Sequence, residues 1–375
     1  MIATVDSVAA VQEAVLVSDR LLPVGAQTKP ALSAVTDPGT VRLDCAGLSG
    51  ISAYDPAELT LTAAAGTPIV ELADALAAHG QYLPFDPPLA AAGATLAGTV
   101  AAGLSGAGAQ RYGGLRDFII GVEFVDGRGR HVHGGGRVVK NAAGFDLPKL
   151  MVGSLGRLGV IVAVSLKVFP RARAHRTLAA TFASPAAALD TIGVLNRGPL
   201  ALEALDLTSE GRLLVRLGGD DGTLTALTER AEATIGTACE RIDGPEEAAM
   251  WAASAALTAL RGNGDRASEN PSDSDAPSGD LIRIPLTPPQ LPPLSTALTA
   301  AGARHRFSRG ASVAWAHWPA DRTLTELSDR LADLGLGGQR LWGRPGPPLL
   351  GTVPGGPFAD RVRAALDPDH RFPEL

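Results

Sequence analysis

The chain has 375 residues, a formal net charge of −6, 44 glycines and 28 prolines, and 45% of its residues are hydrophobic. That length suits about two domains of ~150 residues each. The glycine and proline content indicates a loop-rich α+β protein and argues against a coiled coil or a solenoid. The acidic balance excludes a general nucleic-acid-binding surface. No stretch of ~18 uninterrupted apolar residues occurs, so we expect no membrane span.

Cysteine usage narrows the cofactors that the chain can hold. Only Cys45 and Cys239 are present, and no CxxC pair occurs, so the chain by itself cannot ligate an iron–sulfur cluster or a Cys-type zinc ion. Two distant cysteines suit a reducing compartment, and the N-terminus lacks the pattern of a secretory signal. We expect a cytoplasmic protein, peripheral at the inner membrane face only through partners.

Hydrophobic patterning in the first part of the chain predicts helices and strands in alternation. The helices are expected over residues 8–17, 69–79 and 147–152, and the strands over 21–25, 41–44, 59–63, 118–125, 130–133 and 160–169. Ser7 can cap the first helix, and Gly80 can end the second. The residues Asp126-Gly127-Arg128-Gly129 predict a hairpin turn.

The pattern of predicted strands and helices changes after Arg171. Strands are expected over 177–182, 202–207, 213–217, 281–285, 312–318 and 339–342, and helices over 185–196, 223–235, 246–260, 288–301, 321–334 and 358–366. This alternation predicts an α+β domain with an antiparallel sheet that is covered on one side. Residues 261–280 are polar and acidic without large apolar groups, so we predict a mobile surface loop there.

Small residues between apolar strands are the most informative feature of the chain, and they are concentrated from Pro84 to Pro170. Glycine lets the main chain pass close to a neighbour, and small residues with free N–H groups form concavities that bind anions. A long, planar, phosphate-bearing cofactor fits this pattern.

The candidate cofactor-binding residues form four segments. They are Pro23, Gly25, Ala26, Gln27, Thr28 and Lys29 in the first; Gly93, Ala94, Thr95, Gly98 and Thr99 in the second; Arg111, Tyr112 and Gly113 in the third; and Lys140, Gly144, Gly153, Ser154, Gly156, Gly159, Val160 and Ile161 in the fourth.

Each segment also has a plainer structural interpretation. The first can be an ordinary turn, and the second a small-residue helix packed on a sheet. In the third, Arg111 can neutralise a phosphate or lie in solvent, and Tyr112 can lie along a ring edge or in a core; both interpretations stay open. In the fourth, we expect Asp146 to cap the helix that starts at Leu147.

The order of these segments resembles the flavin-binding half of the vanillyl-alcohol-oxidase/PCMH-type FAD proteins, and most of all the FAD-binding E subunits of bacterial glycolate oxidases. The strongest motif is Gly144-Phe145-Asp146 followed by Gly153-Ser154-Leu155-Gly156. The resemblance is strong from about residue 21 to residue 171, weaker afterwards, and returns at residues 366–372. Departures from the family pattern are Ala26, Ala97, Phe145, whose apolar ring can still pack, and Arg157.

The resemblance implies an α+β fold with a two-part PCMH-type FAD-binding domain over residues 1–172. It also implies an α+β cap with an antiparallel sheet over 173–350, which contains the loop 261–280, and a C-terminal segment over 351–375 that returns to the FAD domain. The implied cofactor is FAD. Relatives that attach flavin covalently often use a histidine in the first loop, and none lies between Leu21 and Asp44, so we predict non-covalent FAD.

Catalytic residues stay unassigned. Family members that oxidise D-2-hydroxy acids alone carry a run of the kind His-Gly-Asp-Gly-Asn-x-His, which supplies a base or a metal site. Here His175, His305, His317 and His370 are isolated. We interpret Trp315, His317 and Trp318 as sheet packing. His131 and His133 have a metal-ligand spacing, but without a marked third ligand we interpret them as exposed strand residues and predict no metal.

These features favour an FAD-binding subunit of a glycolate oxidase-like complex. It would relay electrons or support assembly with a homologous catalytic flavin subunit, which oxidises a small 2-hydroxy acid, and an iron–sulfur subunit. The alternatives are a free-standing FAD-dependent 2-hydroxy acid dehydrogenase and a structural subunit with an empty cofactor site.

Overall fold

The computed structural model describes residues 2–34, 37–136, 145–258, 260, 279–353 and 355–374. The chain divides into two compact units: Met1–Ser105, Gly114–Arg171 and Pro354–Leu375 form the first, and Gly106–Gly113 and Ala172–Val353 form the second. The short segment Gly106–Gly113 thus belongs to the second unit, although the sequence boundaries assign it to the first. Most of the predicted loop 261–280 lies outside the described residues.

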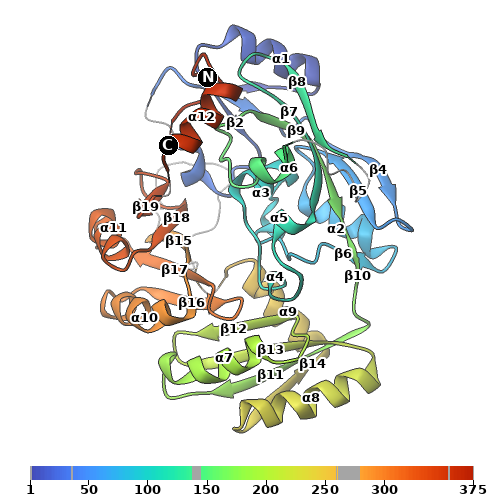
Figure 1. Cartoon of the computed structure of the whole chain (residues 1–375), viewed down its shortest axis with the longest axis vertical. Helices are drawn as coiled ribbons and strands as arrows, with labels where there is room; N and C mark the ends of the chain where they lie inside the picture. Colours follow the sequence, from blue (N-terminus) through green and yellow to red (C-terminus); the bar gives the residue numbers. More distant parts are fainter. Residues whose placement is uncertain are drawn as a thin grey trace. The chain divides into compact units, whose positions relative to one another are not determined.

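In the part of the first unit that the structure describes, the strands form three sheets (Figure 1). A parallel sheet has the order β1 (Ile2–Thr4), β3 (Val41–Asp44), β2 (Leu21–Val24), and an antiparallel sheet has the order β4 (Ile51–Asp55), β5 (Thr60–Ala64), β9 (Val160–Lys167), β7 (Ile119–Val125), β8 (His131–Gly135). A short ribbon pairs β6 (Gln81–Tyr82) with β10 (Phe169–Pro170).

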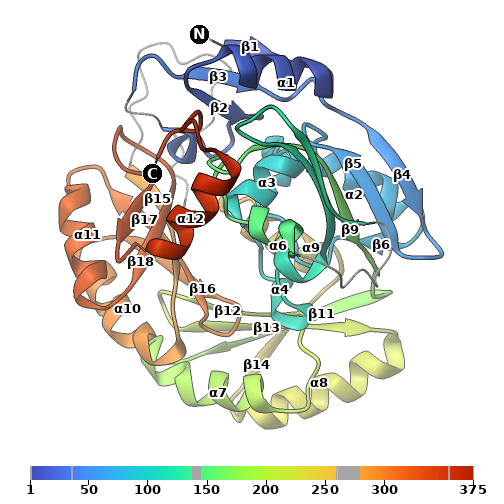
Figure 2. The ribbon, with the colours of Figure 1, turned by 45° about the horizontal axis from the view of Figure 1, so that its top comes forward.

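Helices connect and cover these sheets (Figure 2). They are α1 (Val8–Val17), α2 (Ile69–Ala77), α3 (Leu96–Ala102), α5 (Leu115–Phe118), α6 (Leu147–Met151) and α12 (Pro357–Leu366), with 3-10 turns η1 (Pro30–Ser33) and η2 (Ala90–Ala92). As expected, Ser7 caps α1 and Asp146 caps α6 through the Lys149 N–H. The predicted hairpin turn joins β7 to β8.

The central strand β9 follows directly from its composition. Its valines and isoleucine are buried on both faces, as suits β-branched residues in the middle of a sheet. Because β9 pairs with both β5 and β7, it fixes the position of the small-residue segment Gly153–Gly159 that immediately precedes it.

The described residues of the second unit form one antiparallel sheet of nine strands. Their order is β14 (Cys239–Asp243), β11 (Ala174–Thr181), β13 (Arg212–Gly219), β12 (Ala204–Thr208), β16 (Arg304–Ser308), β17 (Val313–Pro319), β15 (Gly279–Pro285), β18 (Gly337–Trp342), β19 (Leu349–Gly351). Its helices are α4 (Ala109–Tyr112), α7 (Leu189–Arg197), α8 (Asp221–Ile235), α9 (Gly244–Ala255), α10 (Leu291–Ala300) and α11 (Leu324–Asp333), with 3-10 turns η3 (Ala186–Ala188) and η4 (Pro288–Gln290).

This sheet is covered on both faces, whereas the sequence predicts cover on one. The main core holds Leu213 and Val215 together with residues of α7, α8, α10 and α11, and Figure 2 shows these four helices along one side of the sheet. Leu214 alternates with those core residues and therefore faces the other way. It packs with Ala204 and with Trp251 of α9.

The C-terminal segment completes the core of the first unit. Phe372 is 1% exposed and packs in a cluster with Leu21, Leu43 and Val160. The fully buried Asp367 carboxylate accepts hydrogen bonds from the N–H groups of Arg371 and Phe372, at 2.9 and 2.8 Å. The last residues are thus an integral part of this unit.

Replacing Phe372 with alanine should destabilise the first unit by about 3–5 kcal/mol, because the deletion leaves a cavity in a closed core. Urea unfolding followed by circular dichroism measures the loss. Phe358→Ala is the matched control, since Phe358 is 70% exposed on α12 and its truncation should change little. All four tryptophans lie in the second unit, so their fluorescence reports that unit separately. Equal midpoints for the two variants would contradict this role of Phe372.

Candidate functional site

A cavity that is partly open to solvent, with about 750 Å³ of empty space, lies in the first unit and is walled by β2, η1, α3 and β9 and by the loops beside them. Its lining residues are Pro23, Val24, Gly25, Ala26, Gln27, Thr28, Lys29, Leu32, Ser33, Cys45, Ala65, Gly66, Thr95, Ala97, Gly98, Ala101, Ala102, Leu155, Gly156, Gly159 and Ile161. Glycine and alanine are the commonest residues in this wall, so main-chain atoms contribute much of its surface.

The first predicted segment enters the cavity where β2 ends. All of its predicted residues line the wall, and Gln27 adopts a left-handed φ of 49°. A Cβ atom at Gly25 would lie 2.6 Å from Oγ1 of Thr95, and one at Gly156 would lie 2.9 Å from Cγ of Pro23. Three predicted segments therefore touch one another at positions where only glycine fits without a shift.

The second predicted segment contributes through the start of α3. Thr95 caps this helix by accepting a hydrogen bond from the Gly98 N–H, and both residues line the cavity. Thr99 does not line it: its side chain is 1% exposed, and its hydroxyl has no hydrogen-bond partner in the described part of the chain. The alternation along one turn of helix explains why Gly98 and Ala101 face the cavity and Thr99 does not.

Lys29 supplies a cationic group beside this cavity. Only 7% of the residue is exposed, and its Nζ donates to Thr28 Oγ1 at 2.9 Å. Burial lowers the pKa of Lys29 to about 8, because the ammonium ion loses its hydration without a compensating anion. An anionic group in the cavity would supply that missing charge.

Several predicted residues lie elsewhere. Gly93, Ala94, Gly153, Ser154 and Val160 are close in sequence to the wall but do not line the cavity, and Lys140 and Gly144 lie outside the described residues. Gly159 and Ile161 do line it.

The third segment, Arg111, Tyr112 and Gly113, belongs to the second unit. Arg111 forms an ion pair there with Glu203, and its guanidinium lies over the Tyr112 ring, 4.8 Å from the centroid. Glu203 is buried, which raises the pKa of its carboxyl, and Arg111 opposes that shift. Arg111 thus pairs with a carboxylate inside the second unit. It does not line the cavity, and its charge is not left to solvent alone.

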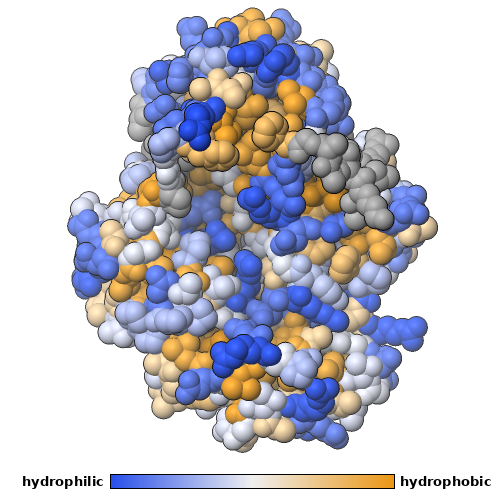
Figure 3. All heavy atoms as spheres, viewed as in Figure 1, coloured by the Kyte–Doolittle hydropathy of each residue, from blue (hydrophilic) through white to orange (hydrophobic). Residues whose placement is uncertain are grey.

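Two of the residues that depart from the family pattern, Arg157 and Phe145, lie in different environments. Arg157 is buried and donates to the carbonyls of Pro373 and Ala34, at 3.3 and 3.2 Å, so it supports the wall from behind. The Phe145 side chain is 95% exposed, so among the described residues this ring is not packed in a core. On the face drawn in Figure 3, hydrophobic residues reach the surface in several separate places among hydrophilic ones.

Sequence reasoning missed part of the wall. The missed residues are Val24, Leu32, Ser33, Cys45, Ala65, Gly66, Ala97, Ala101, Ala102 and Leu155. The run Ala63-Ala64-Ala65-Gly66 at the end of β5 repeats the small-residue pattern and was the available signal. No sequence signal marks Cys45, because only the pairing of β2 with β3 brings this residue to the cavity.

Two histidines of the second unit, His305 and His317, are buried. His305 is 3% exposed, and its ring nitrogens contact Ser295 Oγ at 3.1 Å and the Ala303 carbonyl at 3.0 Å. Burial lowers the pKa of His305. His317 is buried on β17 with Trp315 and Trp318, which confirms the sheet-packing interpretation. Among the described residues, no helix is long and apolar enough to cross a membrane.

Comparison with known proteins identifies FAD as the cofactor of this chain. Residues 1–135 match the family model "FAD binding domain". Glycolate oxidase subunit GlcE of Escherichia coli is 42% identical over 180 residues, which are 48% of this chain and 51% of that protein. D-lactate dehydrogenase of Archaeoglobus fulgidus is 32% identical over 192 residues, 51% of this chain and 42% of that one.

Glycolate oxidase subunit GlcD of Bacillus subtilis is 29% identical over 168 residues, 45% of this chain and 36% of that protein. The chain thus spans about half or less of the length of these curated relatives. Among solved structures, an alkyldihydroxyacetonephosphate synthase superposes with a TM-score of 0.71 at 14% identity, over 99% of this chain and 76% of that one. This likeness confirms the α+β fold predicted from the sequence.

The wall of the cavity, made of main chain, hydroxyls and a buried cation, has the chemistry to hold an anionic cofactor such as FAD. Residues 1–135 therefore carry an FAD-binding domain, as the family model that they match describes it.

Proposed function

We propose that this chain is an FAD-binding subunit of a glycolate oxidase-like 2-hydroxy acid dehydrogenase complex, in which it relays electrons or supports assembly. Its proposed partners are a homologous catalytic flavin subunit and an iron–sulfur subunit. The observation that carries the proposal is the glycine-lined cavity with Thr28 and Lys29, taken together with the 42% identity to glycolate oxidase subunit GlcE.

We assign the FAD diphosphate to the first loop of the cavity. The main-chain N–H groups after β2, the Thr28 hydroxyl and the Lys29 ammonium supply donors there, and such a group of donors suits a diphosphate. When bound, FAD accepts and passes on electrons. The chain orients it and excludes water from it through the small residues of α3 and the segment before β9.

The proposed attachment is non-covalent. Cys45 lines the cavity, but burial and the charge of Asp44 raise the pKa of this thiol to about 12. A protonated thiol is a poor nucleophile, so Cys45 is not suited to form a bond to the flavin. Denaturing the protein with acid should release all FAD into the supernatant.

The structural positions of His305 and His317 favour a relay or assembly role over direct substrate oxidation. A free-standing dehydrogenase is the second candidate, because a D-lactate dehydrogenase is 32% identical over half of this chain. In that case a residue not yet recognised would remove the hydroxyl proton of the substrate.

The two candidates differ in one anaerobic experiment. If the chain is a relay or assembly subunit, adding glycolate or D-lactate to the purified FAD-loaded protein should leave the flavin absorbance unchanged. Bleaching should appear only when the homologous flavoprotein and a cysteine-rich iron–sulfur chain are co-expressed and co-purified with it. Bleaching of the isolated chain would reject the relay proposal and support the dehydrogenase.

FAD affinity should depend on pH through Lys29. The free protein releases the Lys29 proton near pH 8, whereas a bound phosphate holds that proton. Binding is therefore strongest below pH 8 and should weaken about tenfold between pH 7 and pH 9. Isothermal titration calorimetry with FAD measures this slope.

Lys29→Met should bind FAD more weakly and remove the slope. Lys149→Met is the matched control, because Lys149 is 42% exposed and pairs with Asp146, so it should keep the wild-type slope. A slope that survives in Lys29→Met would contradict the assignment.

Filling the cavity from α3 should abolish FAD retention. Ala101 lines the cavity without being part of the closed core, so Ala101→Trp places a bulky ring where the cofactor would lie. Thr99→Trp is a poorer probe, because Thr99 is buried away from the cavity. The control Ala73→Trp is on the exposed side of α2 and should purify with FAD. FAD content equal to that of wild type in Ala101→Trp would place the cofactor elsewhere.

A further inference from the structure

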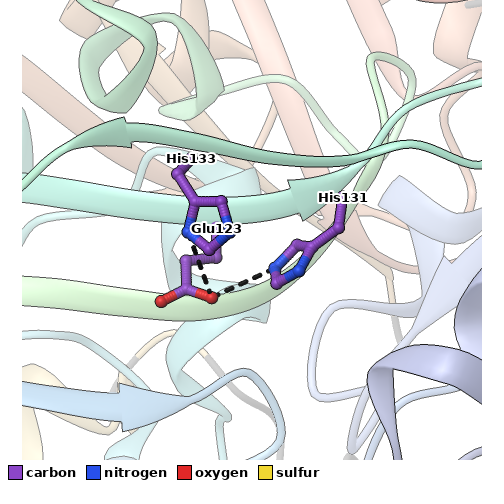
Figure 4. Close-up of side chains that lie close together, drawn as sticks. All are labelled: Glu123, His131 and His133. Atoms are coloured by element: carbon purple, nitrogen blue, oxygen red, sulfur yellow. Dashed lines mark hydrogen bonds and ion pairs between the residues drawn. The ribbon is translucent and has the colours of Figure 1, made fainter.

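Two histidines and a glutamate converge at the β8 edge of the antiparallel sheet in the first unit. His131 and His133 project from the same side of the edge strand β8, and the strand register sets Glu123 of β7 directly opposite His133. Figure 4 shows the three side chains directed toward one another. Glu123 is the third ligand that the sequence did not mark, because only strand pairing brings it beside the histidines.

The spacing of the three groups matches a metal site. Glu123 Oε2 lies 3.0 Å from His131 Nε2 and 3.5 Å from His133 Nδ1, and one potential ligand atom from each residue lies within 4.8 Å of the others. In a tetrahedral zinc site with ligand distances of about 2.0–2.2 Å, neighbouring ligand atoms lie about 3.3–3.5 Å apart. The cluster therefore needs only small movements to close around an ion.

Exposure and ligand type indicate which ion fits. The side chains of His131, Glu123 and His133 are 27%, 36% and 63% exposed, so an ion can reach them and water can complete its coordination. Two imidazoles with one carboxylate suit zinc-type transition metals, whereas calcium and magnesium prefer oxygen ligands. None of the three residues lines the FAD cavity.

We propose that Glu123, His131 and His133 form a surface site for a zinc-type divalent cation, with a fourth position open to water. The ion would join the edge strand β8 to β7 through side chains in addition to the main-chain ladder. A purely hydrogen-bonded cluster is the competing explanation, since both imidazoles already contact the same carboxylate oxygen.

Calorimetric titration of the untagged, EDTA-treated full chain with Zn²⁺ distinguishes the two. The proposal expects one site per chain, weakened at least about tenfold in each of His131→Ala, His133→Ala and Glu123→Gln. His79→Ala, which removes an exposed histidine of the same unit, should bind as wild type does. Magnesium should give no comparable heat.

Two further measurements test whether the variants are folded and whether Zn²⁺ binds outside the cluster. FAD content and circular dichroism should be unchanged in the three variants, and Zn²⁺ should raise the melting temperature of wild type but not of His133→Ala. No Zn²⁺ binding by wild type, or binding that survives in all three variants, would overturn the proposal. So would binding that disappears only in Cys239→Ser.

Discussion

Close approach of bare main chain is the constraint on which the FAD-binding unit depends. A Cβ atom at Gly66 would lie 2.3 Å from the Cys45 carbonyl oxygen, which leaves no room for any side chain. Similar contacts at Gly25 and Gly156 bring three separate loops together around one cavity. The loss of conformational entropy at glycine is the cost of this arrangement, and the buried strands β5 and β9 supply the rigid support that keeps the loops in place.

The cavity wall shows which parts of a binding site can be predicted from local sequence. Residues 23–29 follow a strand and carry their own turn and hydroxyl pattern, so they could be assigned directly. Arg111 could not, because its partner Glu203 lies 92 positions away in the chain and because both residues belong to the second unit, not to the unit that contains the cavity. Cys45 and Gly66 were missed for the same reason: strand pairing, which local pattern does not reveal, brings them to the wall.

The helices and strands also differ in how well local sequence predicts them. Amphipathic or strongly apolar elements such as α2 and β9 were predicted close to their observed bounds. The strands β14 and β16 were not, because their charged residues, such as Glu240 and Arg306, conceal the pattern of a half-buried strand. Their place in the sheet comes from neighbours, since β16 pairs with both β12 and β17.

The first unit combines segments from the beginning and the end of the sequence, so the order of synthesis affects when each unit can fold. The first unit cannot close its core before residue 372 has been synthesised, because Phe372 fills that core. Almost all of the second unit is continuous and precedes this point, so it can fold while the ribosome is still adding residues. During that interval the partial FAD-binding unit exposes the apolar surface that Phe372 will cover, which makes the nascent chain a natural client for chaperones.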